Sequence, residues 1–291
     1  YRTSGGEMVW NEQLKREIPK GWEVTNIGNL TTVVTGKEDA NIWSVSEADI
    51  SIRTTESGET GAWFYSPTDK TRSVENLIDI YFNSVGRGGV FLLNVPPTTA
   101  GQFEQCDIDA LEEFNEILTN TFTNDKALNA EAIASSTRDD SGNFDASNLT
   151  DTDYDTYWAL PDDQTSGTVT INFEQPTYMD VVELQEYIPL GQRIHDYKVE
   201  VLVGDTWLDY GSGTTIGYKR LVKGKPVTAD AIRVTVDGNA TPILNHIGVY
   251  KTDKRVEEEV EFTSPGTIEA SKYSEKSGDV KEQTKGGISN L

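Results

Sequence analysis

The sequence predicts an α/β segment followed by an all-β sandwich, and two patterns indicate this division. Between residues 42 and 118, apolar residues recur at helical spacing on either side of one short, nearly continuous apolar run. From about residue 122 onward, short runs of alternating apolar and polar residues follow one another, separated by turns. The first pattern is typical of helices that alternate with strands, and the second of an antiparallel sandwich.

The α/β segment contains a helix, a glycine-rich turn and a strand. Residues 74–85 place their apolar side chains on one helical face, and the three glycines within 86–89 end that helix because glycine adopts the dihedral angles of a tight exit. Residues 90–95 form an apolar run, which predicts a parallel strand buried on both faces. Pro96 and Pro97 end this strand because proline cannot donate to a β-ladder.

A second helix is expected over residues 107–118, with Asp107 as its N-cap. The Asn-, Asp- and Thr-rich residues 119–126 are expected to form a linker. The order helix, turn, strand, helix is characteristic of a βα-barrel or a doubly wound sheet. This pattern predicts a fold class but no chemistry.

Six short runs predict the strands of the sandwich. They are 168–173, 180–188, 196–203, 220–228, 231–238 and 246–251. Their spacing by turns is typical of antiparallel strands. Trp158 and Trp207 are expected in the core of this sandwich.

Three motifs in the first 120 residues resemble, in order, the closing part of the catalytic barrel of family 29 glycoside hydrolases, the α-L-fucosidases. They are IWSVSEADISIR at 42–53, WFY at 63–65 and SVGRGGVFLLNVPP at 84–97. The resemblance is closest to the branch that acts on α-1,3/1,4-linked fucose, which carries a Trp-x-x-x-Glu-x-Asp-x-Ser-Ile-Arg segment. It implies that residues 1–121 are the C-terminal part of a (β/α)8-like barrel.

This family implies retaining hydrolysis, which needs two carboxyl groups ~5–5.5 Å apart. A full barrel needs ~250 residues, and the chain opens at Tyr1 without an initiator Met or signal peptide. The nucleophilic Asp and the fucose-binding histidines are therefore expected outside this chain, either upstream or on a separate chain. His195 and His246 both fall in the second domain. This chain alone is expected to be inactive.

The resemblance suggests Glu12, in VWNEQ, as the acid/base, although Trp10 stands where the family has Gly. A surface glutamate is an equally weighted alternative, and Glu47 is a second acid/base candidate or a sugar ligand.

Three further residues are candidates for substrate binding. Trp43 and Trp63 are expected to stack on a sugar face, or else to fill the core. Arg53 is expected to bind substrate, or else a structural carboxylate such as Asp49.

Residues 122–252 resemble the discoidin or factor 5/8 C-type jelly roll, which in bacterial glycosidases is the family 32 carbohydrate-binding module. The motifs are ALNAEAIASST, NLTDTDYDTYWAL, TVTINFEQPTYMDVVELQEYI, AIRVTV and IGVYK. This family implies a structural calcium, for which Asp151, Asp153 and Thr156 supply oxygen ligands. The last ligand position is occupied by His246 instead of Glu, and the alternative is that the aspartates cap their own turn.

Residues 253–291 are expected to be an acidic linker followed by the truncated start of a further carbohydrate-binding module, since TIEASKY at 267–273 resembles a family 6-type first strand. The formal net charge of −23 argues against nucleic acid or an anionic membrane as a partner, because both are polyanions. No apolar stretch approaches the ~20 residues of a membrane span. The single cysteine, Cys106, excludes an intrachain disulfide and is expected to be inert.

Together these features predict part of a secreted exo-α-L-fucosidase, extracellular or periplasmic, that releases α-1,3/1,4-linked fucose from oligosaccharides or glycoconjugates without a catalytic cofactor. The alternative is a non-catalytic glycan-binding or scaffolding protein with a vestigial barrel. An upstream barrel half that carries the Asp and the histidines would favour the enzyme.

Overall fold

The structure, a computed structural model, describes residues 8–11, 16–19, 45–58 and 62–256. All of these lie within one compact unit, Tyr1–Glu258. Strands β1 (Met8–Asn11) and β2 (Arg16–Pro19) pair as an antiparallel hairpin. Among the described residues, no helix has both the length and the apolar character needed to cross a membrane.

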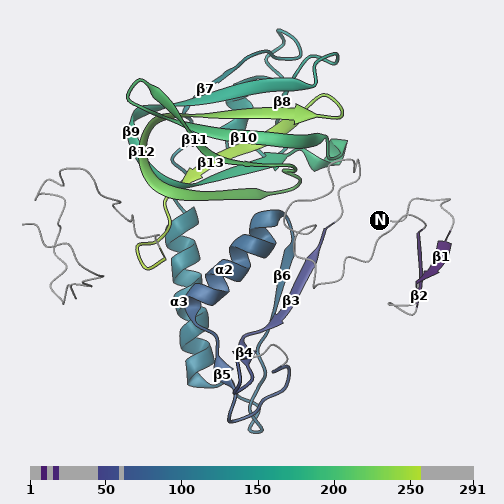
Figure 1. Cartoon of the computed structure of the whole chain (residues 1–291), viewed down its shortest axis with the longest axis vertical. Helices are drawn as coiled ribbons and strands as arrows, with labels where there is room; N and C mark the ends of the chain where they lie inside the picture. Colours follow the sequence, from purple (N-terminus) through teal and green to yellow (C-terminus); the bar gives the residue numbers. More distant parts are fainter. Residues whose placement is uncertain (1–7, 12–15, 20–44, 59–61, 257–291) are drawn as a thin grey trace, which may run out of the picture. The chain divides into compact units, whose positions relative to one another are not determined.

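In the α/β segment, two parallel strands are covered on one face by two helices (Figure 1). The elements are β3 (Glu47–Ser51), β4 (Arg53–Thr54), β5 (Lys70–Thr71), α2 (Val74–Ser84), the 3-10 turn η1 (Val85–Arg87), β6 (Val90–Asn94) and α3 (Gln105–Phe122). The core on the helix side forms around Ile52, Leu77 and Ala110, against which Leu93 and Val95 pack. The helix face of the sheet is thus buried.

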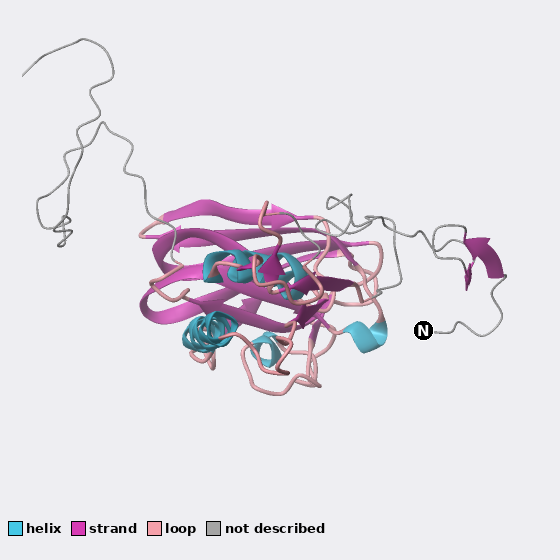
Figure 2. Ribbon diagram, turned by 90° about the horizontal axis from the view of Figure 1, so that it is seen from below, coloured by secondary structure: helices cyan, strands magenta, loops and turns pink. Residues whose placement is uncertain are grey.

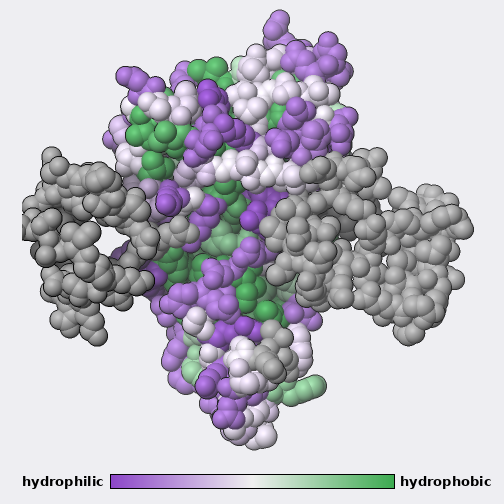
Figure 3. All heavy atoms as spheres, in the orientation of Figure 1, coloured by the Kyte–Doolittle hydropathy of each residue, from purple (hydrophilic) through white to green (hydrophobic). Residues whose placement is uncertain are grey.

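The opposite face of β3–β6 is not covered by any described residue, so the prediction of a strand buried on both faces is wrong for β6. Val90 is 47% exposed and Leu92 is 50% exposed, and their partners in the parallel register are Glu47 and Asp49. Successive side chains of a strand point to opposite faces. Leu93 therefore meets the helices, whereas Leu92 does not. Figure 3 shows hydrophobic residues, in green, at the surface of the α/β segment.

Helix α2 forms where predicted and ends at Ser84, two residues before the first of the three glycines. It is capped at its start by Ser73, whose side chain accepts from the Asn76 backbone N–H. The helix continues into η1, which Gly88 ends with a φ of 78° in the left-handed region, where a side chain would be strained. The chain then enters β6 two residues later.

Helix α3 differs from its prediction at both ends. It begins at Gln105, with Glu104 in the N-cap position, so Asp107 lies inside the first turn and is not the cap. It continues to Phe122, so the first part of the expected linker is helical. The Thr121 hydroxyl donates to the Ile117 carbonyl, and the hydroxyl of Thr123, the residue that caps the helix, donates to the Thr119 carbonyl.

The sandwich is built from antiparallel strands, as predicted, but two pairs of expected strands are fused. The elements are β7 (Glu131–Ala134), η2 (Ala146–Leu149), β8 (Trp158–Ala159), β9 (Ser166–Glu186), η3 (Ile188–Leu190), β10 (Ile194–Val203), β11 (Thr206–Gly213), β12 (Arg220–Gly238) and β13 (Ile243–Tyr250). The long strands β9 and β12 pass from one layer to the other, with register shifts in their pairing near Val227 and Ala231.

Each half of these long strands pairs with a different set of neighbours, and Figure 2 shows the strands of the sandwich, in magenta, stacked above one another. The first half of β9 pairs with β7 and with the end of β12, to which β10 and β11 are added. The second half of β9 pairs with the start of β12 and with β13, followed by β8. The core between the layers includes Trp158, which is fully buried as predicted. Trp207 is not in this core. It lies half-buried at the surface, where the Arg233 guanidinium stacks 4.2 Å from its ring centre.

The helices of the α/β segment pack on the outer face of the layer formed by the second half of β9, the start of β12, and β13. Phe122 of α3 lies edge-on to Tyr250 of β13, with ring centres 5.1 Å apart. A Cβ at Gly86 would lie only 3.2 Å from Leu221, so a residue without a side chain permits this close approach. The α/β segment and the sandwich therefore share a packed, partly aromatic junction.

Candidate functional site

The first candidate site lies where β3 and β6 end. The strands are parallel and pair Ser51 with Asn94, so their carboxyl ends meet. The Asn94 amide donates to the Ser51 hydroxyl at 3.3 Å and to the backbone carbonyl of Trp63 at 3.1 Å. The Ser51 hydroxyl in turn donates to the Ala62 carbonyl at 2.7 Å. These bonds hold the segment that carries Trp63 over the strand ends.

Aromatic side chains project from this held segment. Trp63 is 41% exposed and Phe64 is 88% exposed, so neither fills a core among the described residues. Tyr65 is anchored, because its hydroxyl donates to Glu104 at 2.6 Å. The backbone of this segment is fixed while the Trp63 indole stays available to a ligand.

Arg53 contacts this segment, with its guanidinium 5.2 Å from the Tyr65 ring centre, and it is bound to a carboxylate, though not to Asp49. Its Nε donates to Asp107 Oδ2 at 2.8 Å, and the two residues are 3% and 0% exposed. Burial disfavours the charged guanidinium, but the hydrogen bond and charge of Asp107 outweigh it and raise the pKa of Arg53. Thr71 donates to the other Asp107 oxygen at 2.6 Å. Arg53 therefore supports the site.

Glu47 lies away from these residues. It is the first residue of β3, whereas Ser51 is the last. Four strand steps place it about 13 Å from the carboxyl end. Asp49, between them, is exposed on the same uncovered face. The two remaining candidates, Glu12 and Trp43, lie outside the described residues.

Cys106 is exposed next to this site. The Thr71 hydroxyl lies 3.1 Å from its sulfur, and an Arg53 nitrogen lies 3.7 Å from it.

The aspartate-rich turn before Trp158 is closed by its own hydrogen bonds. Asp151 accepts the Asp153 backbone N–H at 2.8 Å and the Thr156 hydroxyl at 2.9 Å. Asp153 accepts the Asp155 backbone N–H at 3.0 Å. Within the described part of the chain, no group of three or more His, Cys, Asp or Glu side chains is arranged to hold a metal ion. The oxygen donors suit calcium in kind, and their hydrogen bonds also match aspartates that cap their own turn.

His246 is buried beside this turn. It is 4% exposed, its Nε2 lies 3.7 Å from Asp125 Oδ2, and its ring centre is 5.2 Å from that of Tyr154. Burial lowers the pKa of His246, and burial raises the pKa of Asp125. Asp125 is fixed because it accepts the Ala127 and Val249 backbone N–H groups, at 2.9 and 2.8 Å.

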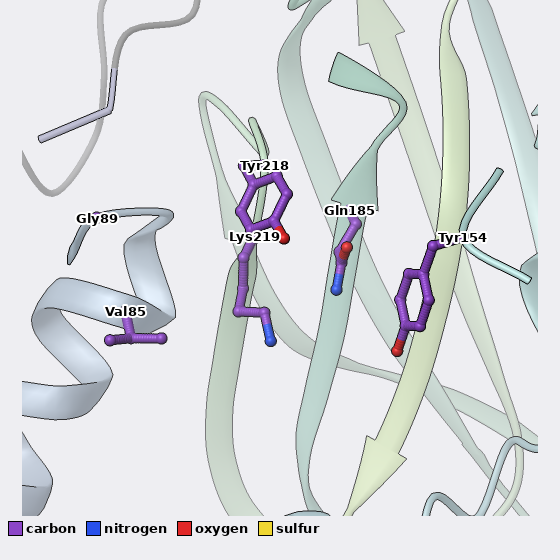
Figure 4. A pocket seen from close by; sticks show the side chains of 6 residues that line it. All are labelled: Val85, Gly89, Tyr154, Gln185, Tyr218 and Lys219. Atoms are coloured by element: carbon purple, nitrogen blue, oxygen red, sulfur yellow. The ribbon is translucent and has the colours of Figure 1, made fainter. Parts of the chain in front are cut away.

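A pocket of about 300 Å³ lies at the junction of the α/β segment and the sandwich. It is lined by Val85, Gly89, Tyr154, Gln185, Tyr218 and Lys219 (Figure 4). None of these residues was singled out as a candidate from the sequence, because the pocket joins four separate stretches of chain. The available signals were the polar residues Glu183, Gln185 and Glu186 within one strand, and Tyr154 in the aspartate-rich turn.

In comparisons with known proteins, each half of the chain matches a different family model. A family model described as alpha-L-fucosidase matches residues 26–121, and a model described as F5/8 type C domain matches residues 131–247. Alpha-L-fucosidase 1 of Arabidopsis thaliana is 35% identical over 213 residues, covering 72% of this chain and 41% of that protein. The chain spans about two fifths of the length of the curated relatives it matches, 40% and 41%.

Solved structures give the same result. A Ruminococcus gnavus GH29 fucosidase in complex with fucose is 36% identical, with a TM-score of 0.70 over 77% of this chain and 44% of that chain. The crystal structure of SpGH29 is 39% identical, with a TM-score of 0.67 over 75% of this chain and 46% of that chain. These similarities extend across the α/β segment and the sandwich together.

Proposed function

Since this chain belongs to the α-L-fucosidases by its residues 26–121 and carries an F5/8 type C domain at residues 131–247, we propose that it is part of a retaining exo-α-L-fucosidase. It acts on α-1,3/1,4-linked fucose in oligosaccharides or glycoconjugates. The nucleophilic aspartate comes from a catalytic portion outside this chain, present upstream or as a separate chain. By itself the chain has no turnover.

The observation that carries this proposal is the arrangement at the carboxyl ends of β3 and β6. In (β/α)8 barrels the active site lies at the carboxyl ends of the strands, and here that end holds Asn94, Ser51 and the exposed Trp63. The uncovered face of β3–β6, with Val90 and Leu92 half exposed, also supports this proposal. In a closed barrel, further strands would pair at the edges of this sheet and curve round to bury that face.

In the proposed reaction, the external aspartate attacks the anomeric carbon and the acid/base carboxyl protonates the leaving glycosidic oxygen. The same acid/base group then deprotonates the water that releases fucose from the enzyme. Glu12 is our candidate for this group. The Trp63 indole packs against the C–H face of the sugar, with Trp43 and Glu47 as further contacts. Arg53 is held by Asp107 and is a positioning residue.

The remaining assignments are proposals as well. Residues 1–121 form the barrel portion, 122–252 the sandwich, and 253–291 a linker with the start of a further module. An extracellular or periplasmic location suits a secreted glycosidase. The net charge of −23 disfavours polyanionic partners.

The first experiment measures the mass of the native protein under denaturing conditions and its activity on a chromogenic α-L-fucoside. We expect either a longer chain or a companion fragment, and turnover only where that portion is present. Glu12→Gln should remove turnover, and Trp63→Ala should raise KM about tenfold through lost sugar contact. The matched control is Trp207→Ala, which removes a tryptophan from the sandwich and should leave turnover unchanged.

Two results would contradict the proposal. One is a lone 32.2 kDa species that comes from a gene without an upstream barrel half, which would favour the glycan-binding or scaffolding alternative. The other is release of fucose with inversion at the anomeric carbon, followed by NMR. Comparison of α-1,2- with α-1,3/1,4-fucosylated oligosaccharides tests the linkage preference separately.

A further inference from the structure

The pocket at the junction combines polar groups from the sandwich with a small apolar wall from the α/β segment. Figure 4 shows the side chains of Lys219, Gln185 and Tyr154 side by side, with Val85 across from them. Its volume of about 300 Å³ lies at the lower end of the range for small-molecule sites. It is therefore large enough for a single small ring.

The charges in this pocket are balanced. The Lys219 ammonium lies 2.9 Å from Glu183 Oε1, and the Gln185 amide donates to the same oxygen. Burial lowers the pKa of Lys219, but the Glu183 charge outweighs it, so the pKa of Lys219 is raised and the ion pair persists. An anionic ligand would meet a neutralised lysine and a chain of net charge −23. A cationic ligand would meet a carboxylate that is already bonded. The pocket therefore suits a neutral ligand that both donates and accepts hydrogen bonds.

Tyr154 forms one wall of the pocket, and its side chain is accessible to solvent although its position is fixed by buried neighbours. It is 53% exposed, but its backbone carbonyl accepts the Asn245 amide at 3.0 Å and its ring rests on that of His246. Asn245 and His246 are 8% and 4% exposed, so this support is buried. Tyr218 is also 53% exposed and lines the same pocket. Two tyrosine rings beside polar donors suit a ligand with apolar C–H faces and hydroxyl edges.

We propose that this pocket binds one saccharide unit, a neutral pyranose. Its C–H faces contact Tyr154 and Tyr218, and its hydroxyls bond to Lys219 and the Gln185 amide. The site is separate from the proposed catalytic end. Val85 and Gly89 precede the start of β6, whereas Trp63 is held at the carboxyl ends of β3 and β6. The proposal needs no catalysis by this chain, so its failure and that of the fucosidase assignment are distinguishable.

The test is binding of methyl pyranosides to the full chain, measured by calorimetric titration and saturation-transfer NMR. The probes are methyl α-L-fucoside, methyl β-D-galactoside and methyl N-acetyl-β-D-glucosaminide, with galacturonate as the charged comparator. We expect at least one neutral pyranoside to bind and galacturonate to bind more weakly. Tyr154→Ala and Tyr218→Ala should each weaken binding about tenfold. Both tyrosines are half exposed, so their removal should leave the fold intact.

The matched control is Tyr178→Ala, which removes a tyrosine of similar exposure, 45%, outside the pocket. It should leave binding unchanged. The proposal is overturned if no neutral pyranoside binds the unmodified chain, or if galacturonate binds more tightly than all of them. It is also overturned if Tyr178→Ala weakens binding as much as the two pocket variants do. If one pocket variant does not fold, the other decides the result.

Discussion

Arg53 and Asp107 are 54 residues apart in the sequence, yet Arg53 Nε lies 2.8 Å from Asp107 Oδ2. Both side chains are almost completely buried, at 3% and 0% exposure. The pair connects β4 to the first turn of α3. Thr71 and Tyr65, which contact the two partners, extend this connection to β5 and to the segment that carries Trp63.

This pair predicts a large cost for Asp107→Asn. The substitution leaves a buried guanidinium without its counter-charge, which should lower the free energy of unfolding by about 3 kcal/mol. Asp109→Asn, on the same helix, is the control. Asp109 is exposed, and within the described part of the chain its side chain accepts a hydrogen bond from Gln105 alone, so its loss should cost less than about 0.5 kcal/mol. Equal costs in urea unfolding would refute a structural role for the pair.

The uncovered face of β3–β6 predicts unequal costs of alanine substitution for two adjacent leucines. Leu93→Ala removes contacts with the helix-side core and should cost about 2 kcal/mol in this chain. Leu92→Ala, at 50% exposure, should cost less than about 0.5 kcal/mol. Urea unfolding of the chain alone measures both.

In a longer protein that supplies further barrel strands, Leu92→Ala should become costly as well, because Leu92 would then be buried. If Leu92→Ala cost as much as Leu93→Ala in the chain alone, another part of this chain would have to cover that face.

The hydrogen bonds of Asp253 predict that the stability of the junction between α3 and the chain after β13 depends on pH. Its hydrogen bonds from Arg255 are the main cause that holds the pKa of Asp253 well below its ordinary value, and Asn120 of α3 donates to it as well. A depressed carboxyl pKa contributes stability that is present above pH ~4 and is lost as the pH falls below that value. The contact between α3 and the chain after β13 should weaken over that range.

Asp253→Asn should therefore cost about 0.5–1 kcal/mol at pH 7 and progressively less as the pH falls below 4. Thermal unfolding at a series of pH values measures this difference. Glu174→Gln removes one exposed negative charge from β9 and corrects for the change in net charge. A cost for Asp253→Asn that does not change with pH would argue against the ion pair.

The aspartate-rich turn predicts how the chain responds to metal. Because Asp151 and Asp153 accept hydrogen bonds from their own turn and His246 stands at the last ligand position, chelation with EDTA should change the thermal midpoint by less than about 1 °C. A rise of several degrees with calcium, lost in Asp151→Asn, would instead establish the calcium site that the resemblance implies. The control substitution is Asp163→Asn, outside the turn.

Much of the local structure could be predicted from the sequence. The apolar spacing of residues 74–85 predicts α2, and Gly88 ends the turn that follows it at a positive φ. The β alternation predicts the antiparallel strands. The errors occur where a residue's role depends on distant chain. Asp107 has the chemistry of an N-cap, but Arg53 holds it inside the helix. Trp207 is large and apolar, but it is placed at the surface under Arg233.

The sequence by itself determined the element types, the two halves of the chain and, through its motifs, the family. These depend on short-range spacing and on residue identity. The tertiary structure alone decided which carboxylate neutralises Arg53, which face of β6 is covered, and that Tyr154, Gln185 and Lys219 line one pocket. Side chains far apart in sequence meet only through packing and register. No local pattern specifies those contacts, because their energies depend on burial, which belongs to the folded chain as a whole.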